Sequence, residues 1–130
     1  MIALIRAAAV MLYPRTDTMP GIDECDLDAF LVRFKAESPL LMWVGVAFGA
    51  LVFHLTPVLT VGWPVPAPLL PRHLQHRHAH ELSLTENYLL RQIVFLLKFP
   101  LGLAWGSHPS VRALYALPPY PRDPGTWRAE

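Results

Sequence analysis

Apolar side chains recur along this chain mainly at three- and four-residue spacing, which is the spacing of one face of an α-helix. Runs that alternate apolar and polar residues between turns, as strands do, are missing outside the proline-rich segments. The pattern therefore predicts an all-α fold, a small irregular helical domain. We expect five helices, near residues 2–13, 23–37, 40–55, 84–99 and 109–116.

The clearest amphipathic pattern lies in residues 22–38. Its apolar residues share one helical face: Leu27, Phe30, Leu31 and Phe34. Acidic residues gather at the N-terminal end and basic residues near the C-terminal end, which is the order that the helix dipole favours. Further along, Ser83 and Glu86 have the spacing of a capping box and predict a helix that begins after Ser83. We expect Pro100 and Gly102 to break or kink that helix.

Residues 38–71 contain no Asp, Glu, Lys or Arg. Their apolar centre, residues 40–53, carries Gly45 and Gly49 at a spacing that allows close helix packing in lipid or in protein. A membrane-spanning helix needs about 20 apolar residues, so this centre is short unless it extends toward Trp63. Three interpretations stay open: a helix buried against a partner protein, a helix in or on a membrane, and the core helix of a monomer.

Prolines indicate the domain organisation. Of the 14 prolines, those in residues 62–72 predict an extended, polyproline-like connector, and those after Leu117 predict an extended C-terminal arm. We therefore expect residues 1–130 to form a single helical domain. Its N-terminal helices would occupy residues 1–61, and its C-terminal helices and tail residues 73–130.

The amino-acid composition and net charge exclude some classes of protein. Hydrophobic residues make up 53% of the chain and charged residues only 16%, against about a quarter charged in an average globular protein. So few charges leave apolar surface for a partner or a lipid to cover. A net charge of +1 excludes an electrostatic nucleic-acid binder. One cysteine, Cys25, excludes an internal disulfide framework.

Four histidines form the most conspicuous chemical cluster: His73, His76, His78 and His80. His76 and His80 have the spacing of helical zinc ligands, but no motif supplies a third ligand, and the neighbouring arginines repel a divalent cation. We therefore expect no metal site here, and a solvated or interface stretch instead. His54, in the uncharged segment, is expected to be a buried, neutral, hydrogen-bonded side chain.

Motifs of catalysis are missing from the sequence. It contains no glycine-rich phosphate loop, dinucleotide-binding fingerprint or nucleophile elbow. Cys25 lies among acidic residues, which raise the pKa of a thiol and disfavour the nucleophilic thiolate. The sequence therefore predicts no catalytic residue and no cofactor-binding residue in this chain.

Several short motifs occur in an order that resembles a known family. They are an alanine-rich first helix ending in Leu12-Tyr13-Pro14, the helix Leu27-Asp28-Ala29-Phe30-Leu31, Leu82-Ser83 before an apolar helix reaching Lys98, and His108-Pro109-Ser110-Val111 before a proline-rich exit. This order resembles the small, or gamma, subunit of GMC-type FAD-dependent oxidoreductases, the gluconate 2-dehydrogenase subunit 3-like family. The resemblance implies an all-helical accessory subunit that binds and stabilises a large FAD-binding subunit.

Two functions are therefore expected as alternatives. The first is a non-catalytic small subunit of an FAD-dependent alcohol or sugar oxidoreductase, with the FAD in its partner. The second is a small single-pass or monotopic membrane protein anchored by residues 40–63. In the first case, aromatic residues would anchor the interface, chiefly Trp43, Phe48, Trp63 and Trp105. The sequence shows no twin-arginine motif or signal-peptide pattern, which predicts a cytoplasmic protein with membrane association left open.

Overall fold

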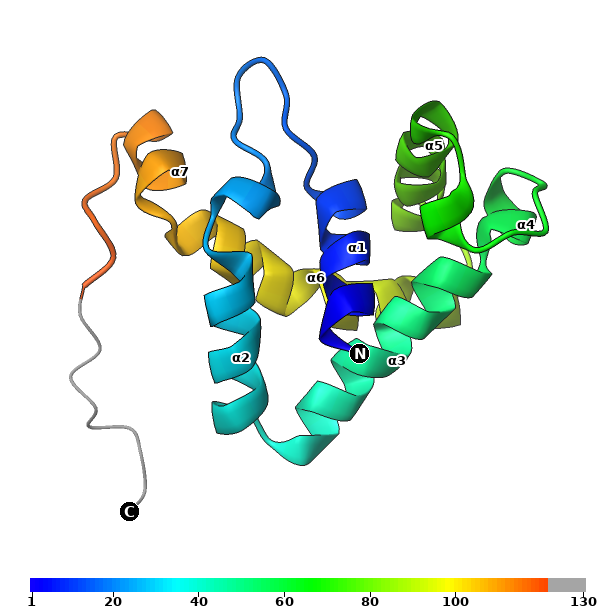
Figure 1. Cartoon of the computed structure of the whole chain (residues 1–130), viewed down its shortest axis with the longest axis horizontal. Helices are drawn as coiled ribbons and strands as arrows, with labels where there is room; N and C mark the ends of the chain where they lie inside the picture. The colour runs from blue at the N-terminus through cyan, green and yellow to red at the C-terminus, as the bar shows by residue number, and fades with distance from the viewer. Residues whose placement is uncertain (122–130) are drawn as a thin grey trace.

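The structure, a computed structural model, describes residues 1–121, which are mostly helical (Figure 1). The α-helices are α1 (Ile2–Leu12), α2 (Leu27–Glu37), α3 (Leu40–Leu55), α4 (Pro57–Thr60), α5 (Arg72–Ser83), α6 (Tyr88–Ser107) and α7 (Pro109–Leu114). Two 3-10 turns lie at Ile22–Glu24 and Ala67–Leu69. Residues 1–121 contain no strand, so the all-α prediction is confirmed.

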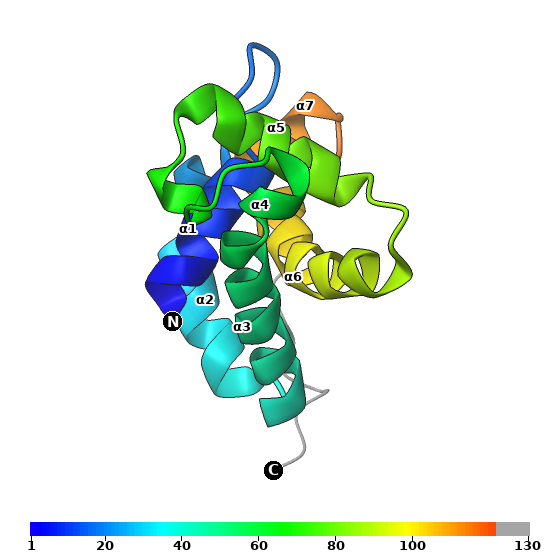
Figure 2. The same cartoon turned by 90° about the vertical axis from the view of Figure 1, so that its right-hand side faces the viewer.

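Helices α1, α3 and α6 build the centre of the fold. The longest helix, α6, passes behind α1 and α3 in Figure 1, and Figure 2 shows α3 between α1 and α2 on one side and α6 on the other. Fully buried side chains from these helices form the core, including Ile5, Val46, Phe53, Leu97 and Leu101. One face of the uncharged segment therefore belongs to the core of this chain itself.

The contact between α3 and α6 depends on a small residue. A Cβ atom added to Gly49 would lie 3.0 Å from the carbonyl oxygen of Ile93 and 3.1 Å from the Cβ of Leu97. Both neighbours are fixed to the backbone and cannot move aside as the end of a flexible side chain would. Of the two glycines of the uncharged segment, Gly49 thus serves a close contact between helices of the same chain.

Residues 22–37 form two elements where one helix is predicted. The 3-10 turn at Ile22–Glu24 ends at Cys25, and α2 begins at Leu27. Asp26 lies between them with φ of 49°, in the left-handed region, where a right-handed helix cannot continue. The break allows both Ile22 and Leu27 to reach the core. The prediction of a continuous helix from residue 23 is therefore wrong at its N-terminal end.

The predicted extended connector at residues 62–72 is only partly extended. A 3-10 turn at Ala67–Leu69 interrupts it, and the chain enters α5 at Arg72. Ala67 and Leu70 are buried because the connector packs against α3 and α5. The sequence pattern also misses α5 itself, which is a 12-residue helix with His78, Ala79 and Leu82 on its buried side.

The helix predicted for residues 84–99 begins later than expected. Ser83 is the last residue of α5, and its hydroxyl donates to the carbonyl of Ala79 (2.7 Å). The N-cap of α6 is Asn87, whose side chain accepts a hydrogen bond from the Leu90 amide (3.1 Å). The prediction of a helix that starts at a Ser83–Glu86 capping box is therefore wrong.

The same helix also continues beyond its expected end. Proline removes one helical hydrogen bond, yet α6 continues through Pro100 to Ser107. Pro100, Leu101 and Ala104 are all buried, and their packing offsets the lost bond. Next to this position, the Tyr13 hydroxyl donates to the carbonyl of Lys98 (3.1 Å) and joins α6 to the end of α1.

Replacing Asn87 with alanine should lower the free energy of unfolding by about 1 kcal/mol, because the Leu90 amide loses its only capping acceptor in this turn. Glu86→Gln is the matched control, since Glu86 takes no part in the cap, and its effect should stay within about 0.5 kcal/mol. Chemical denaturation followed by circular dichroism measures both. Equal effects of the two substitutions would contradict the assignment of Asn87 as the cap.

The last helix is shorter than predicted, because α7 ends at Leu114, with Pro109 at its first turn as expected. Residues 117–121 then run without helix, in agreement with an extended arm. Here Arg112 donates to the carbonyl of Pro118 (2.6 Å) and lies over the Tyr120 ring. The rest of the predicted arm, residues 122–130, lies outside the described residues.

Candidate interaction surface

One face of α3 and α4 is apolar and exposed. The outward positions follow helical spacing and are all large hydrophobic residues: Leu40, Leu41, Val44, Phe48, Leu51 and Leu55 on α3, with Val58 and Leu59 on α4. No charged residue interrupts them, because residues 38–71 contain none. An exposed apolar stripe of this kind is typical of a surface that binds a protein or a membrane.

Helix α6 adds a second exposed stripe next to the first. Its outward hydrophobic residues are Tyr88, Leu89, Phe95, Leu96, Phe99 and Leu103. The two stripes meet where Leu96 approaches Gly45 of α3, with 3.7 Å between the leucine Cδ1 and a Cβ built on the glycine. We call the two stripes together the apolar surface, and it is the candidate functional site of this chain.

The four aromatic residues predicted as interface anchors divide into two pairs. Phe48 and Trp63 are about half exposed, 53% and 50%, and are available to a partner. Trp43 packs against the core beside Phe34, and Trp105 also packs against the core. The second pair therefore contributes to the stability of this chain, and only the first pair lies free on its surface.

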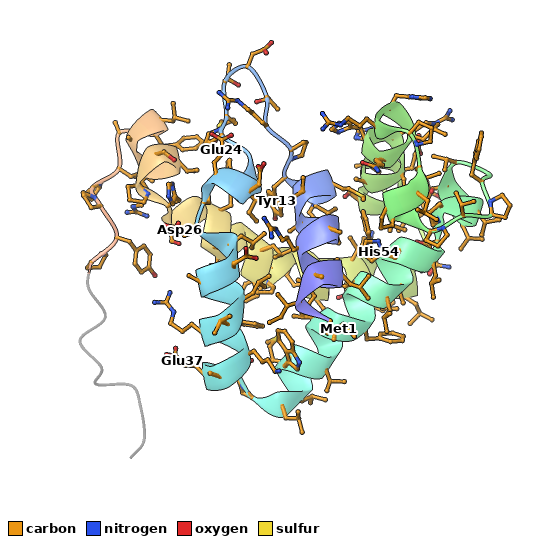
Figure 3. The ribbon with its side chains drawn as sticks, in the orientation of Figure 1. Met1, Tyr13, Glu24, Asp26, Glu37 and His54 are labelled. Atoms are coloured by element: carbon orange, nitrogen blue, oxygen red, sulfur yellow. The ribbon has the colours of Figure 1, made fainter. Side chains whose placement is uncertain are left out.

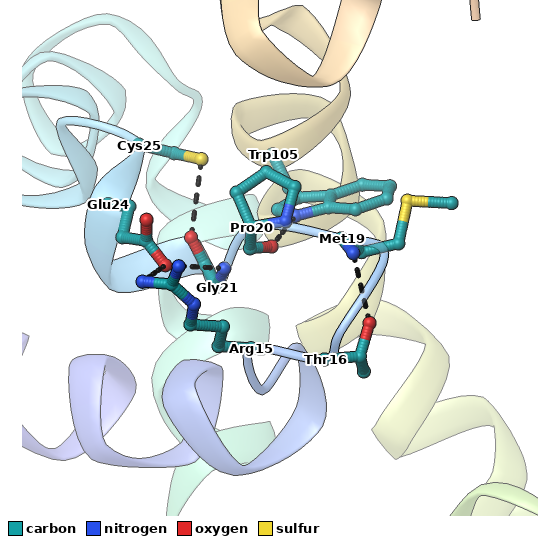
Figure 4. A network of polar contacts seen from close by, with 8 residues as sticks. All are labelled: Arg15, Thr16, Met19, Pro20, Gly21, Glu24, Cys25 and Trp105. Carbon is teal, nitrogen blue, oxygen red and sulfur yellow. Dashed lines mark hydrogen bonds and ion pairs between the residues drawn. The ribbon is translucent and has the colours of Figure 1, made fainter. Parts of the chain in front are cut away.

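Trp105 belongs to a polar network that holds the loop after α1 (Figure 4). Its indole Nε1 donates to the carbonyl of Pro20 (2.9 Å). In the same loop the Gly21 amide donates to the carboxylate of Glu24 (3.1 Å), which also pairs with Arg15 (3.4 Å). The loop between α1 and α2 is thus fixed by its own side chains and by α6.

Cys25 is buried and adds one more hydrogen bond to this network. Its thiol donates to the carbonyl of Gly21 (3.4 Å). Burial raises the pKa of the Cys25 thiol, and the nearby carboxylates of Glu24, Asp23 and Asp26 raise it further. The thiolate is therefore disfavoured, and the pKa of the thiol shifts in the direction expected from the acidic residues around Cys25.

Membrane-spanning potential lies in a different helix from the one predicted. By length and composition alone, α6 is the one helix in residues 1–121 that could cross a membrane, and 28% of that stretch is buried inside the fold. The apolar helix α3 has 16 residues, or about 24 Å, against about 30 Å of hydrocarbon. It also ends at Leu55, before α4, so residues 40–63 do not form one continuous helix.

Two buried histidines link the helices at the other end of α3. His54 of α3, labelled in Figure 3, is 4% exposed, and its Nε2 donates to the carbonyl of Leu4 in α1 (2.8 Å). His78 of α5 is fully buried, and its Nε2 donates to the carbonyl of Phe53 (2.8 Å). The carbonyl acceptors assign the proton of each neutral ring to Nε2. The prediction for His54 is confirmed, whereas the buried role of His78 is not seen in the sequence pattern.

The surroundings of the Nδ1 atoms explain why both histidine rings are neutral. Nδ1 of His78 accepts from the Thr60 hydroxyl (2.6 Å), and Nδ1 of His54 is buried without a partner in residues 1–121. Burial lowers the pKa of both histidines below their usual value of 6.5, although each carbonyl contact opposes the shift. Repulsion from His54 lowers the pKa of His78 further.

The histidine cluster of α5 is not brought together for metal binding. His73, His76 and His80 are exposed, whereas His78 points into the core. Within residues 1–121 no three His, Cys, Asp or Glu side chains lie close enough to hold a metal ion. Of the four histidines, His78 therefore belongs to the core, and the other three lie on the surface.

Comparison with known proteins found no matching family model, no matching curated protein and no matching solved structure. The apolar surface of α3, α4 and α6 is consequently the feature of this chain on which a functional conclusion can rest.

Proposed function

We propose that this chain is a non-catalytic accessory subunit that binds a larger protein through the apolar surface. The observation that carries this proposal is the exposure of large hydrophobic residues over α3, α4 and α6, next to a core that is complete without them. Covering such a surface stabilises a complex by about 25 cal/mol per Å² of apolar area removed from water. The chain supplies binding area, and its partner supplies the chemistry.

The order of sequence motifs supports a class of partner. It resembles the small subunit of GMC-type oxidoreductases, so we propose a large FAD-binding subunit that oxidises an alcohol or a sugar. The chain is all-helical, and Phe48 and Trp63, two of the four expected anchors, are exposed and can contact that partner. The FAD belongs to the partner in this proposal, and this chain holds no cofactor of its own. The complex would lie in the cytoplasm.

Co-expression with the neighbouring reading frames tests this proposal. The chain should co-purify with a large subunit that shows flavin absorbance. Phe48→Glu and Leu55→Glu together should reduce capture of that subunit at least about tenfold, since burying two unpaired carboxylates costs several kcal/mol. Val32→Glu on α2 is the matched control, because Val32 is equally exposed but lies outside the apolar surface. A colourless chain that purifies alone would contradict the proposal.

A membrane-bound protein is the second candidate, and the length and composition of α6 favour it. In this alternative the apolar surface contacts lipid, either as a monotopic face or through a span formed by α6. Flotation with phosphatidylcholine vesicles distinguishes the two candidates. Stable flotation of the chain without any partner protein supports the membrane role, and loss of flotation on co-expression with the large subunit supports the accessory role.

A further inference from the structure

A cleft beside the apolar surface has a different character from its surroundings. It lies where α6 passes the ends of α1 and α5, and its volume is about 330 Å³. Four polar residues line it: Tyr13, Ser83, Arg91 and Lys98. Its apolar walls include Phe95 and Phe99 of α6. The volume lies at the lower end of the range for small-molecule sites.

The two cations of the cleft are not neutralised by the protein. The ion pairs in residues 1–121 join Arg6 to Asp28 and Arg15 to Glu24, and neither involves Arg91 or Lys98. No carboxylate lines the cleft. Arg91 lies over the Tyr88 ring, 5.9 Å from its centroid, and this contact leaves its N–H groups free. The cleft therefore holds two positive charges that lack a partner anion in the described part of the chain.

The hydroxyl groups of the cleft are already committed as donors. The Ser83 hydroxyl donates to the Ala79 carbonyl and accepts from the ammonium of Lys98 (3.4 Å). The Tyr13 hydroxyl donates to the carbonyl of Lys98, and burial raises the pKa of Tyr13, so it keeps its proton. Ser83 thus orients the ammonium, and the free donors are those of Arg91 and Lys98. A ligand that satisfies them must be an acceptor, and an anion satisfies them best.

The apolar side of the cleft limits the kind of anion. Phe95 and Phe99 are 57% and 49% exposed, and they continue the wall of the cleft into the apolar surface. A small inorganic anion would leave this wall in water. A hydrocarbon chain attached to the anion would cover it, and each CH₂ group buried adds favourable transfer free energy.

We propose that this cleft binds an anionic amphiphile. Its carboxylate or phosphate lies between Arg91 and Lys98, and its hydrocarbon chain lies along Phe95 and Phe99. This assignment goes beyond the accessory role, and because Phe95 and Phe99 also belong to the apolar surface, the amphiphile would compete with a partner protein for them. The headgroup could belong to a free fatty acid or to an anionic phospholipid, and the shared chemistry is an anion joined to a hydrocarbon chain.

Photolabelling of the full chain in an uncharged detergent tests this proposal. The probes are a fatty acid that carries a diazirine in its chain and the fatty alcohol of the same length. Mass spectrometry locates the adducts. In the wild-type chain the acid should label α6 near Phe95 and Phe99 about tenfold more than the alcohol does, as expected for two charge-assisted contacts. This first comparison needs no substitution. Equal labelling of α6 by acid and alcohol would overturn the proposal.

Charge variants then test the two cations. Arg91→Met with Lys98→Met should reduce acid labelling of α6 to the level of the alcohol, and Lys98→Arg should retain it. Arg77→Met, on the exposed side of α5, removes one positive charge outside the cleft and serves as the control. Circular dichroism checks that the variants keep their helices. A similar loss of labelling in the control would overturn the proposal, since it would show a general effect of charge.

A second arm distinguishes the two sources of the anion. The chain is placed in phosphatidylcholine vesicles that contain phosphatidylglycerol with a diazirine in its acyl chain. If labelling depends on Arg91 and Lys98 only in the vesicle experiment, the anion is a phospholipid headgroup. If labelling depends on them only in the fatty-acid experiment, the anion is a free carboxylate. Dependence in both arms supports the shared chemistry. Dependence in neither arm overturns the proposal.

Discussion

Gly49→Ala is expected to destabilise the protein, whereas Gly45→Ala is expected to be neutral or stabilising. A methyl group on Gly49 would approach the Ile93 carbonyl and the Leu97 Cβ at 3.0 and 3.1 Å, so α3 and α6 must separate. Overpacking of this kind costs about 1–3 kcal/mol. On Gly45 the nearest atom is the Leu96 Cδ1 at 3.7 Å, an ordinary contact. There the better helix propensity of alanine adds up to about 1 kcal/mol.

The measurement is chemical denaturation of both variants in the same uncharged detergent, followed by circular dichroism. The two substitutions are chemically identical, lie one turn apart on the same helix and differ only in what they face. Their effects on the free energy of unfolding should therefore have opposite signs, or differ by at least about 1 kcal/mol. Equal changes would show that α3 and α6 do not make this close contact.

The first and last residues of α3 could be predicted from the sequence because a proline stands near each end of the helix. Pro39 directly precedes the first helical residue, and Pro57 stands two residues after the last, so the helix lies between two prolines that limit it. The predicted bounds, residues 40–55, are those of the structure. What the sequence left open was which side of α3 faces the core, since every side is apolar and the answer depends on α6.

Helix α5 could not be predicted from an apolar pattern because one of its core residues is a histidine. His78 and Leu82 are buried one turn apart, but His78 reads as polar in the sequence among three exposed histidines. Its burial depends on the Phe53 carbonyl and the Thr60 hydroxyl, which come from distant parts of the chain. Only tertiary structure supplies those partners.

Two capping signals compete near the start of α6, and packing decides between them. Ser83 and Glu86 match a capping box, yet Ser83 is still inside α5, where Leu82 is buried. With Leu82 and Ser83 inside α5, the cap of α6 falls at Asn87. Local propensity is a weak prior in such cases, and burial of an apolar residue overrides it.

The apolar surface could be predicted as a property of the chain, but its position could not. A low share of charged residues indicates that some apolar residues stay exposed, without showing which ones. The cleft between Arg91 and Lys98 left one signal in the sequence. The two cations are seven residues apart, two turns of a helix, so they share a face of α6 that is otherwise apolar.

The buried histidines should make the stability of the fold depend on pH. The pKa values of His54 and His78 are lowered by burial in the folded chain and return to about 6.5 on unfolding. The unfolded state therefore binds more protons below about pH 6.5, and acid favours it. The stabilisation is complete above pH 6.5 and is lost as the pH falls toward the folded pKa values. The slope has a ceiling of about 1.4 kcal/mol per pH unit for each histidine.

The geometry explains why neither ring accepts a second proton easily. Protonated Nδ1 of His54 would be a buried donor without an acceptor in the described residues. Protonated Nδ1 of His78 would turn the Thr60 hydroxyl from donor into acceptor at the 2.6 Å contact, and the hydroxyl proton would have to turn to the longer contacts with the Pro57 carbonyl (3.4 Å) or the Thr56 carbonyl (3.5 Å). Both changes weaken hydrogen bonds inside the core, where an unsatisfied polar group costs about 1–3 kcal/mol.

Denaturation between about pH 8 and about pH 5 measures this dependence, because histidine is the side chain that titrates in that interval. His54→Gln keeps a donor for the Leu4 carbonyl but does not titrate, so it should remove up to about half of the slope. His76→Gln, on the exposed side of α5, is the matched control and should leave the slope as it is. Stability that stays constant down to pH 5, or a slope that survives both His54→Gln and His78→Gln, would show that these histidines are not neutral anchors of the core. If the slope follows the two buried residues alone, α1, α3 and α5 are joined by neutral imidazoles. Mild acid would then loosen the helices that present the apolar surface.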